Sequence, residues 1–253
     1  MIKFFRNIRY KLMEKGNTGK YLKYAIGEIV LVMIGILLAL QVNNWNQGRL
    51  RAIEEIGILK ALKVGLEADL ADLNYNASSI KNSIGHANTI LQSLENDEPY
   101  RDSIADHFGI MMFPVKFLYS TSAFETLKSK GIDLVTNPKL RDDIVSVYDS
   151  RYTFFLEMEK VIVLDEVERG FRTVLQSRFE ESYVFDLSKA NYMPRLVPLN
   201  FETLKQDQEF VYFIKTYRNR LDTFLNFHYK KIIMPQVENL INALEAEIKT
   251  LED

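Results

Sequence analysis

Histidines are the first residues to consider for chemistry. The chain has three, His86, His107 and His228, and histidine is the side chain most often used for metal binding and for proton transfer near neutral pH. Their positions match no zinc-binding spacing, and the sequence contains no H-E-x-x-H motif. His228 lies on an apolar helical stripe, where a hydrogen-bonded core histidine is expected more often than a ligand. The histidines therefore predict no metal site.

Acidic residues are the next candidates, because catalysis by general acids and bases often uses a pair of carboxylates. Asp142 with Asp143, and Glu166 with Glu168, are close in sequence. On a helix such neighbours point to different faces, so we expect solvated charges instead of a catalytic pair. The sequence also lacks cysteine, a nucleophile elbow, a phosphate loop and a dinucleotide fingerprint. We therefore expect no catalytic residues, no cofactor, no metal and no small-molecule substrate, and predict that the protein is not an enzyme.

The strongest single feature of the sequence is an apolar segment at residues 24–43, in which Glu28 is the only charged residue. About 20 helical residues, at about 1.5 Å each, match the hydrocarbon thickness of a bilayer. Tyr21 and Trp45 flank the segment as aromatic interface anchors. The segment ends without the small residues of a signal-peptide cleavage site. The sequence predicts an uncleaved transmembrane helix over residues 21–46.

Three residues of this helix are candidate contacts within the membrane. Glu28 lies about one turn from the start of the span, where its carboxylate can reach the interface or pair with Lys23. The alternative is that Glu28 faces the shared interior of an oligomeric pore. Gly35 and Ala39 form a pair of small residues four apart, a spacing that allows two membrane helices to approach closely.

The charges around the span predict its orientation. Basic residues dominate the chain before it: Lys3, Arg6, Arg9, Lys11, Lys15, Lys20 and Lys23. The positive-inside rule places such a segment in the cytoplasm and exports the chain that follows. We expect residues 1–20 to form a basic amphipathic tail, whose apolar face binds membrane lipid through Ile2, Phe5, Ile8 and Leu12. The alternative is a basic tail that determines topology only.

Residues 47–253 are predicted to form an all-helical domain. An apolar stripe with alternating spacings of three and four follows the span, which predicts a long helix, with breaks expected at Gly57, Gly65 or Gly85. The stripe consists of Leu70, Leu73, Ala77, Ile80, Ile84, Ala87, Leu91 and Leu94. It predicts either packing within one chain's bundle or a coiled coil between chains.

Local signals predict where the later helices begin and end. Residues 96–99 end the long helix, and a short helix is expected at 101–110. Ser122 and Glu125 form a capping box at the start of a short helix that Gly131 closes. Asn137, followed by proline, is expected to begin a long helix.

The final third of the chain is predicted to be one connection and one long helix. Residues 182–200 contain two prolines and lack periodicity, so we expect a long connection and no sheet. Asp207 is expected to cap the last helix. The predicted buried stripe of that helix, with a kink at Pro235, is Phe210, Phe213, Tyr217, Leu221, Phe224, His228, Val237, Leu240, Leu244 and Leu251.

Two stretches resemble a known family. The opening MIKFFRNIRYKLMEKGNTGKYLKYAIGEIVLVMIGILLALQVNNWNQ and the segment SAFETLKSKGIDLVTNPKLRDDIVSVYDS are similar to an uncharacterised Bacteroidota family of membrane-anchored proteins. This resemblance implies a Gram-negative inner membrane and a periplasmic domain, and it carries over no catalytic residues.

These observations predict an all-α, single-pass inner-membrane protein with a cytoplasmic N-terminus and a periplasmic helical bundle. We expect a non-enzymatic interaction or scaffold protein that binds other envelope proteins or itself. Ser122, Phe124 and Glu125 are its candidate interaction surface. The alternative functions are an oligomeric pore or transport component and an enzyme with an unrecognised helical site. The nearly equal numbers of basic and acidic residues, 32 and 34, argue against a nucleic-acid partner.

Overall fold

The computed structural model describes residue 10 and residues 18–186 and 191–253. The chain divides into two compact units, residues 1–55 and 56–253. Most of the predicted amphipathic tail at residues 1–20, including all four of its apolar positions, lies outside the described residues.

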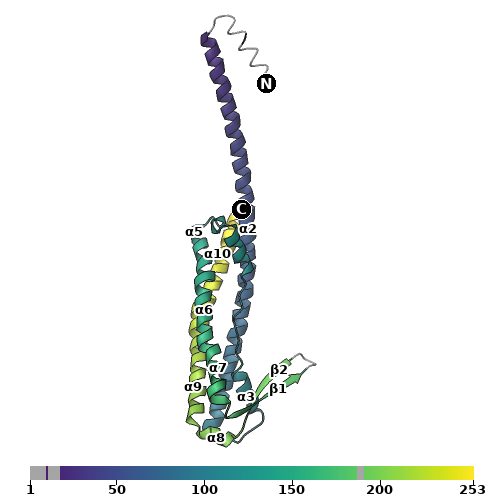
Figure 1. The fold of residues 1–253 in the computed structure, drawn as a ribbon, viewed down its shortest axis with the longest axis vertical. Helices are drawn as coiled ribbons and strands as arrows, with labels where there is room; N and C mark the ends of the chain where they lie inside the picture. The colour runs from purple at the N-terminus through teal and green to yellow at the C-terminus, as the bar shows by residue number, and fades with distance from the viewer. Residues whose placement is uncertain (1–9, 11–17, 187–190) are drawn as a thin grey trace. The chain divides into compact units, whose positions relative to one another are not determined.

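Unit 1 contains the first part of helix α2, which begins at Thr18 and ends at Glu95 (Figure 1). Its large apolar side chains are exposed, from 47% for Val30 to 70% for Trp45. In the described chain this is the one helix long and apolar enough to cross a membrane, with a mean hydropathy of 2.4 over a window of which none is buried. Unit 1 thus provides one candidate span.

Unit 2 is predominantly helical. The helical assignment of α2 continues through Gly57, Gly65 and Gly85, so the expected breaks do not occur. Its other elements are α3 (Ile104–Met111), α4 (Ser122–Lys130), η1 (Ile132–Leu134), α5 (Pro138–Val145), η2 (Ser146–Arg151), α6 (Tyr152–Glu159), η3 (Lys160–Leu164), α7 (Asp165–Gly170), η4 (Phe171–Leu175), β1 (Phe179–Asp186), β2 (Asn191–Pro198), α8 (Phe201–Gln206), α9 (Gln208–Thr223), η5 (Phe224–Ile233) and α10 (Met234–Glu252).

Long helical segments form the frame of unit 2 (Figure 1). They are the second part of α2, the run from α5 to η4, and the run from α9 to α10. The segments η2, η3, η4 and η5 within the last two runs are π-helical. The predicted stripe on α2 is buried or half-buried in the core of this unit, so the chain itself covers the stripe. The all-helical prediction is confirmed at this level.

One part of the fold prediction is wrong. Residues 182–200 are not a plain connection, because β1 and β2 form an antiparallel two-stranded sheet that pairs Phe179 with Pro198 and Asp186 with Asn191. The prolines of β2 suggested a loop because proline donates no ladder hydrogen bond. Proline is nevertheless tolerated in edge strands, and both strands of a two-stranded sheet are edges.

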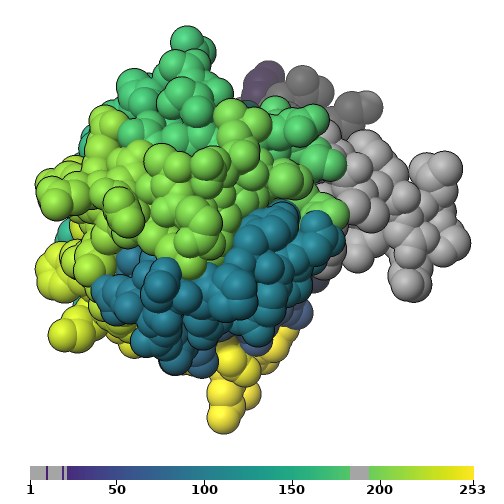
Figure 2. Space-filling model, turned by 90° about the horizontal axis from the view of Figure 1, so that it is seen from below, coloured from purple at the N-terminus to yellow at the C-terminus, as the bar shows by residue number. Residues whose placement is uncertain are grey.

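The sheet packs against the rest of unit 2 through β2 and α3. Gly109 of α3 lies so close to β2 that an added Cβ would be 2.0 Å from the carbonyl oxygen of Pro194. Arg195 holds the same contact with ion pairs of 2.7 Å to Asp102 and Asp106. Figure 2 looks onto this end of the molecule, where the chain after α2 meets α8. There Lys205 pairs with Asp97 at 2.9 Å.

Most of the predicted helix boundaries are confirmed. The Asn137 side chain accepts hydrogen bonds from the backbone N–H groups of Lys139 and Leu140. The Asp207 side chain accepts one from Phe210. Gly131 ends α4 with a φ of 102°, a conformation that favours glycine. The short helix expected at residues 101–110 is α3, which begins at Ile104, three residues later than expected.

Two local predictions are corrected. Ser122 is the first residue of α4 and not its cap, and the preceding Thr121 makes no capping hydrogen bond with its side chain. His228 is half-buried, and its neighbour Tyr229 occupies the core position instead. The π-helical η5 causes this change, since its wider turns shift the buried face by one residue relative to an α-helix.

Candidate functional site

The candidate membrane contacts all lie on α2 in unit 1. Gly35 and Ala39 are exposed, and a Cβ added to Gly35 would have no neighbour within 4 Å. Glu28 is half-buried and has an interaction within the chain. The face formed by Gly35 and Ala39 is therefore open to a partner helix.

The candidate surface on α4 is only partly at the surface. Phe124 is 3% exposed and stacks on Tyr148, with ring centroids 4.6 Å apart. Glu125 is exposed and pairs with Lys128 at 2.6 Å. Of the three predicted residues, Ser122 and Glu125 remain available to a partner, while Phe124 belongs to the core.

The most organised polar site is a carboxylate cluster formed by Asp69, Asp72 and Glu159. It binds the irregular segment 113–120, whose backbone N–H groups have no helix or strand to satisfy them. Both Glu159 oxygens lie 3.1 Å from the N–H of Phe117. Asp72 accepts from Leu118 at 3.1 Å, and Asp69 accepts from Ser120 at 2.7 Å. These bonds fix the segment against α2 and α6.

Two tyrosines complete the carboxylate cluster. The Tyr152 hydroxyl donates to Asp69 at 2.9 Å, and the Tyr229 hydroxyl donates to Glu159 at 3.3 Å. Burial raises the pKa of Glu159 to about 7, although its hydrogen bonds from Phe117 and Tyr229 oppose the shift. Burial also raises the pKa of Asp69. Both carboxylates are 1% exposed, so their surroundings suit a structural role better than substrate contact.

The sequence predictions did not identify the carboxylate cluster. Asp69, Asp72 and Asn76 are spaced three and four residues apart, the spacing of one helical face. Asn76 donates to Asp72 at 3.0 Å. Polar residues next to an apolar stripe are a signal for buried polar contacts. The partners of these residues, however, lie far away in the sequence.

The predicted solvated charges include one exception. Glu168 is exposed and pairs with Arg172, as a surface charge would. The Glu166 side chain is only 6% exposed and pairs with Arg169 and, at 3.0 Å, with Arg220. Glu166 therefore links α7 to α9, and the prediction of a solvated charge is wrong for this residue.

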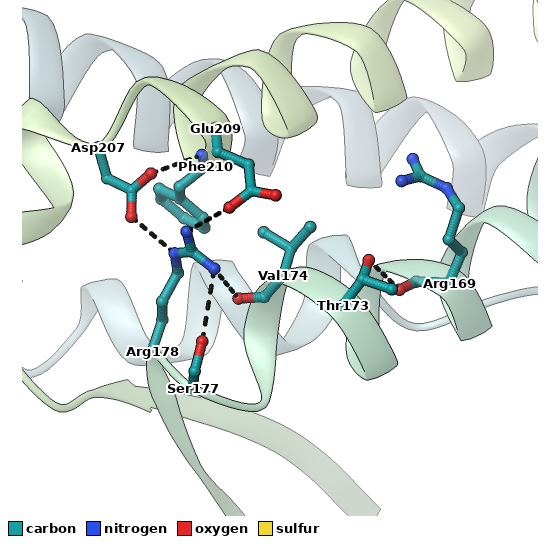
Figure 3. Close-up of polar contacts among 8 residues, drawn as sticks. All are labelled: Arg169, Thr173, Val174, Ser177, Arg178, Asp207, Glu209 and Phe210. Atoms are coloured by element: carbon teal, nitrogen blue, oxygen red, sulfur yellow. Dashed lines mark hydrogen bonds and ion pairs between the residues drawn. The ribbon is translucent and has the colours of Figure 1, made fainter.

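A second ionic network centres on Arg178 (Figure 3). Its guanidinium donates to Asp207, Glu209 and the carbonyl of Val174, each at 2.7 Å. Asp207 also accepts from the backbone N–H of Phe210 at 3.0 Å. One arginine thus joins the end of η4 to the start of α9, and its hydrogen-bonding groups serve the fold.

Two of the histidines meet in the structure. The Nδ1 atoms of His86 and His107 are 2.7 Å apart, so one nitrogen donates to the other in the neutral pair. Burial, with His107 as a second cause, lowers the pKa of His86. Among the described residues, no group of three or more metal-binding side chains occurs.

Comparison with known proteins identifies one family. A family model described as "Family of unknown function (DUF6090)" matches residues 28–168. No curated protein matches the chain. No solved structure matches it either.

Proposed function

We propose that this chain, which belongs to the DUF6090 family of unknown function, is a non-enzymatic interaction or scaffold protein anchored in the inner membrane of Bacteroidota. Its single span would leave the N-terminus in the cytoplasm and unit 2 in the periplasm. Its partners would be other envelope proteins or a second copy of the chain. The resemblance of the opening segment to Bacteroidota proteins supports the membrane and the bacterial group.

One observation carries this proposal: the exposed apolar segment of α2. Its large apolar side chains are exposed in the described part of the chain, and no residue of its most apolar window is buried there. Burying apolar surface contributes about 25 cal/mol for each Å² removed from water, so a segment of this length is strongly stabilised by lipid. The basic residues before the segment support the proposed orientation.

The polar sites of unit 2 support an interaction role. The carboxylate cluster binds the backbone of segment 113–120, and Arg178 joins two helical runs. These charged groups are thus used to hold the bundle together. The exposed parts of unit 2 then act as the binding surface, with Ser122 and Glu125 as the residues predicted to contact a partner.

A pair of reporter fusions tests the topology. A reporter that is active only in the periplasm, fused after Asp253, should give activity, and a cytoplasmic reporter at the same position should not. The opposite pattern would refute the localisation.

Purification in mild detergent should recover a stable partner or an oligomer. Liposomes containing the protein should pass no ions, and a conductance that Glu28→Gln abolishes would favour the pore instead.

A further inference from the structure

A polar pocket of about 230 Å³ lies between the helical run that begins at α5 and helix α10. Five polar side chains line it: Asp143, Ser146, Arg151, Gln236 and Asn239. Val147 and Leu240, both nearly fully buried, also line it. All of these residues belong to unit 2. The pocket lining is therefore mixed, with two apolar residues and a polar set that includes one acid and one base.

The pocket wall departs from regular α-helix. Ser146, Val147 and Arg151 belong to the π-helical η2, and π-helical turns are often found at functional sites. The wider π-turn changes where side chains point relative to an uninterrupted α-helix. Residues on α10 face the same pocket, so two separate elements contribute to it.

The two charged side chains of the pocket are both exposed. Asp143 and Arg151 form no ion pair among the described residues. By contrast, Arg178 and Arg195 each pair with two carboxylates. Asp143 and Arg151 are therefore both available to a bound group of complementary charge.

From these groups we infer that the pocket binds a small zwitterion of amino-acid or dipeptide size. The ligand carboxylate would pair with the Arg151 guanidinium, which has the planar geometry for a bidentate contact. The ligand ammonium would pair with the Asp143 carboxylate. This inference goes beyond the proposed anchoring role and does not depend on it.

Binding is tested by titrating the full-length protein in detergent with L-alanine and with the dipeptide Ala-Ala in a calorimeter. Each ligand is compared with its methyl ester, which lacks the carboxylate, and its N-acetyl form, which lacks the ammonium. At least one zwitterion should bind, and both of its blocked forms should bind at least tenfold more weakly.

Variants identify the site. Arg151→Gln and Asp143→Asn should each weaken binding at least tenfold, while their melting temperatures stay unchanged because both side chains are exposed. Asp142→Asn is the matched control, since Asp142 is an exposed neighbour outside the pocket, and it should bind as the wild type does. Failure of both zwitterions to bind, or binding that Arg151→Gln and Asp143→Asn leave unchanged, would overturn the inference.

Discussion

At the scale of single residues, Glu159 is a carboxylate whose pKa is strongly altered by its surroundings. The same carboxylate contacts the N–H of Phe117 and the hydroxyl of Tyr229, yet it is 1% exposed. Burial disfavours its charge more than these hydrogen bonds favour it, which raises its pKa to about 7 from an ordinary 4.5. Folding therefore increases the proton affinity of Glu159.

This pKa shift predicts how stability depends on pH. The contribution of Glu159 is fully present below pH 4.5 and is lost as the pH rises through 7, a difference of about 3 kcal/mol. Glu159→Gln keeps an oxygen for Phe117 but cannot ionise. It should therefore match the wild type near pH 4.5 and exceed its free energy of unfolding at pH 8.

Urea unfolding of the full-length protein in detergent, followed by circular dichroism at both pH values, measures this difference. Glu159→Ala is the control, because it leaves the N–H of Phe117 and the hydroxyl of Tyr229 without their acceptor. It should be less stable than Glu159→Gln at both pH values. A glutamine variant as unstable as the alanine variant at pH 8 would contradict the raised pKa.

At the scale of elements, the contact between α3 and β2 depends on one glycine. A Cβ at Gly109 would overlap the backbone of Pro194 and Arg195, and backbone atoms cannot move aside as a flexible side chain can. Gly85 lies in α2, where an added Cβ has no neighbour within 4 Å. The two glycines are thus a matched pair, one in close contact and one in open space.

Gly109→Ala should lower the free energy of unfolding by about 1–3 kcal/mol, the range for inserting an extra carbon into a packed site. Gly85→Ala should raise it by about 1 kcal/mol or less, because alanine is the better helix former. Thermal unfolding compares the two variants. Limited proteolysis of Gly109→Ala should cut more quickly near β1 and β2, and equal cutting rates would contradict the proposed role of this contact.

The membrane-facing part of α2 carries its own prediction. Gly35→Leu should leave the fold of a single chain unchanged, because the space around Gly35 is open. It should weaken a contact between two membrane helices, since that contact requires small residues. Cross-linking or analytical ultracentrifugation in detergent measures the oligomer. A wild-type protein that is already monomeric would refute self-association through this face.

At the scale of the whole molecule, unit 2 has a core of its own, with buried residues from Ile58 to Ile248. A chain that begins at Arg49 should therefore fold without the membrane segment and give a predominantly helical circular dichroism spectrum. Its unfolding should be cooperative. A disordered chain would show that unit 2 needs the anchor or a partner to complete its core.

The sequence predicted features that depend on neighbouring residues. Asn137, Asp207 and Gly131 act within a few residues of their own positions, so local signals identified their roles. The carboxylate cluster was missed because Asp69 bonds to Ser120, 51 residues away, and Glu159 bonds to Phe117, 42 residues away. Such pairs depend on tertiary packing, which one sequence does not reveal.

The π-helical segments also limit what the sequence can predict, because α-helical periodicity does not give the buried positions across them. With Glu166 set aside, the buried residues from Tyr148 to Val174 are three or four residues apart, and three spacings of four occur in a row from Phe155 to Val167. Regular α-helix alternates these spacings more evenly, because it has 3.6 residues per turn. The segment η3 absorbs the extra residue.

Because η3 contains one residue more than regular α-helix needs, the helical run can lose one residue there and keep the same face buried. Deleting Val161, an exposed residue of η3, would leave regular α-helix with the core residues on both sides still facing inward. Deleting the exposed Lys81 of α2, which is α-helical throughout, would instead rotate the parts of α2 before and after it by about 100° relative to one another. Thermal unfolding should show a folded protein in the first case and a disrupted one in the second. The helix thus behaves as a chain with a spare residue, able to change length by one at η3 while its core stays the same.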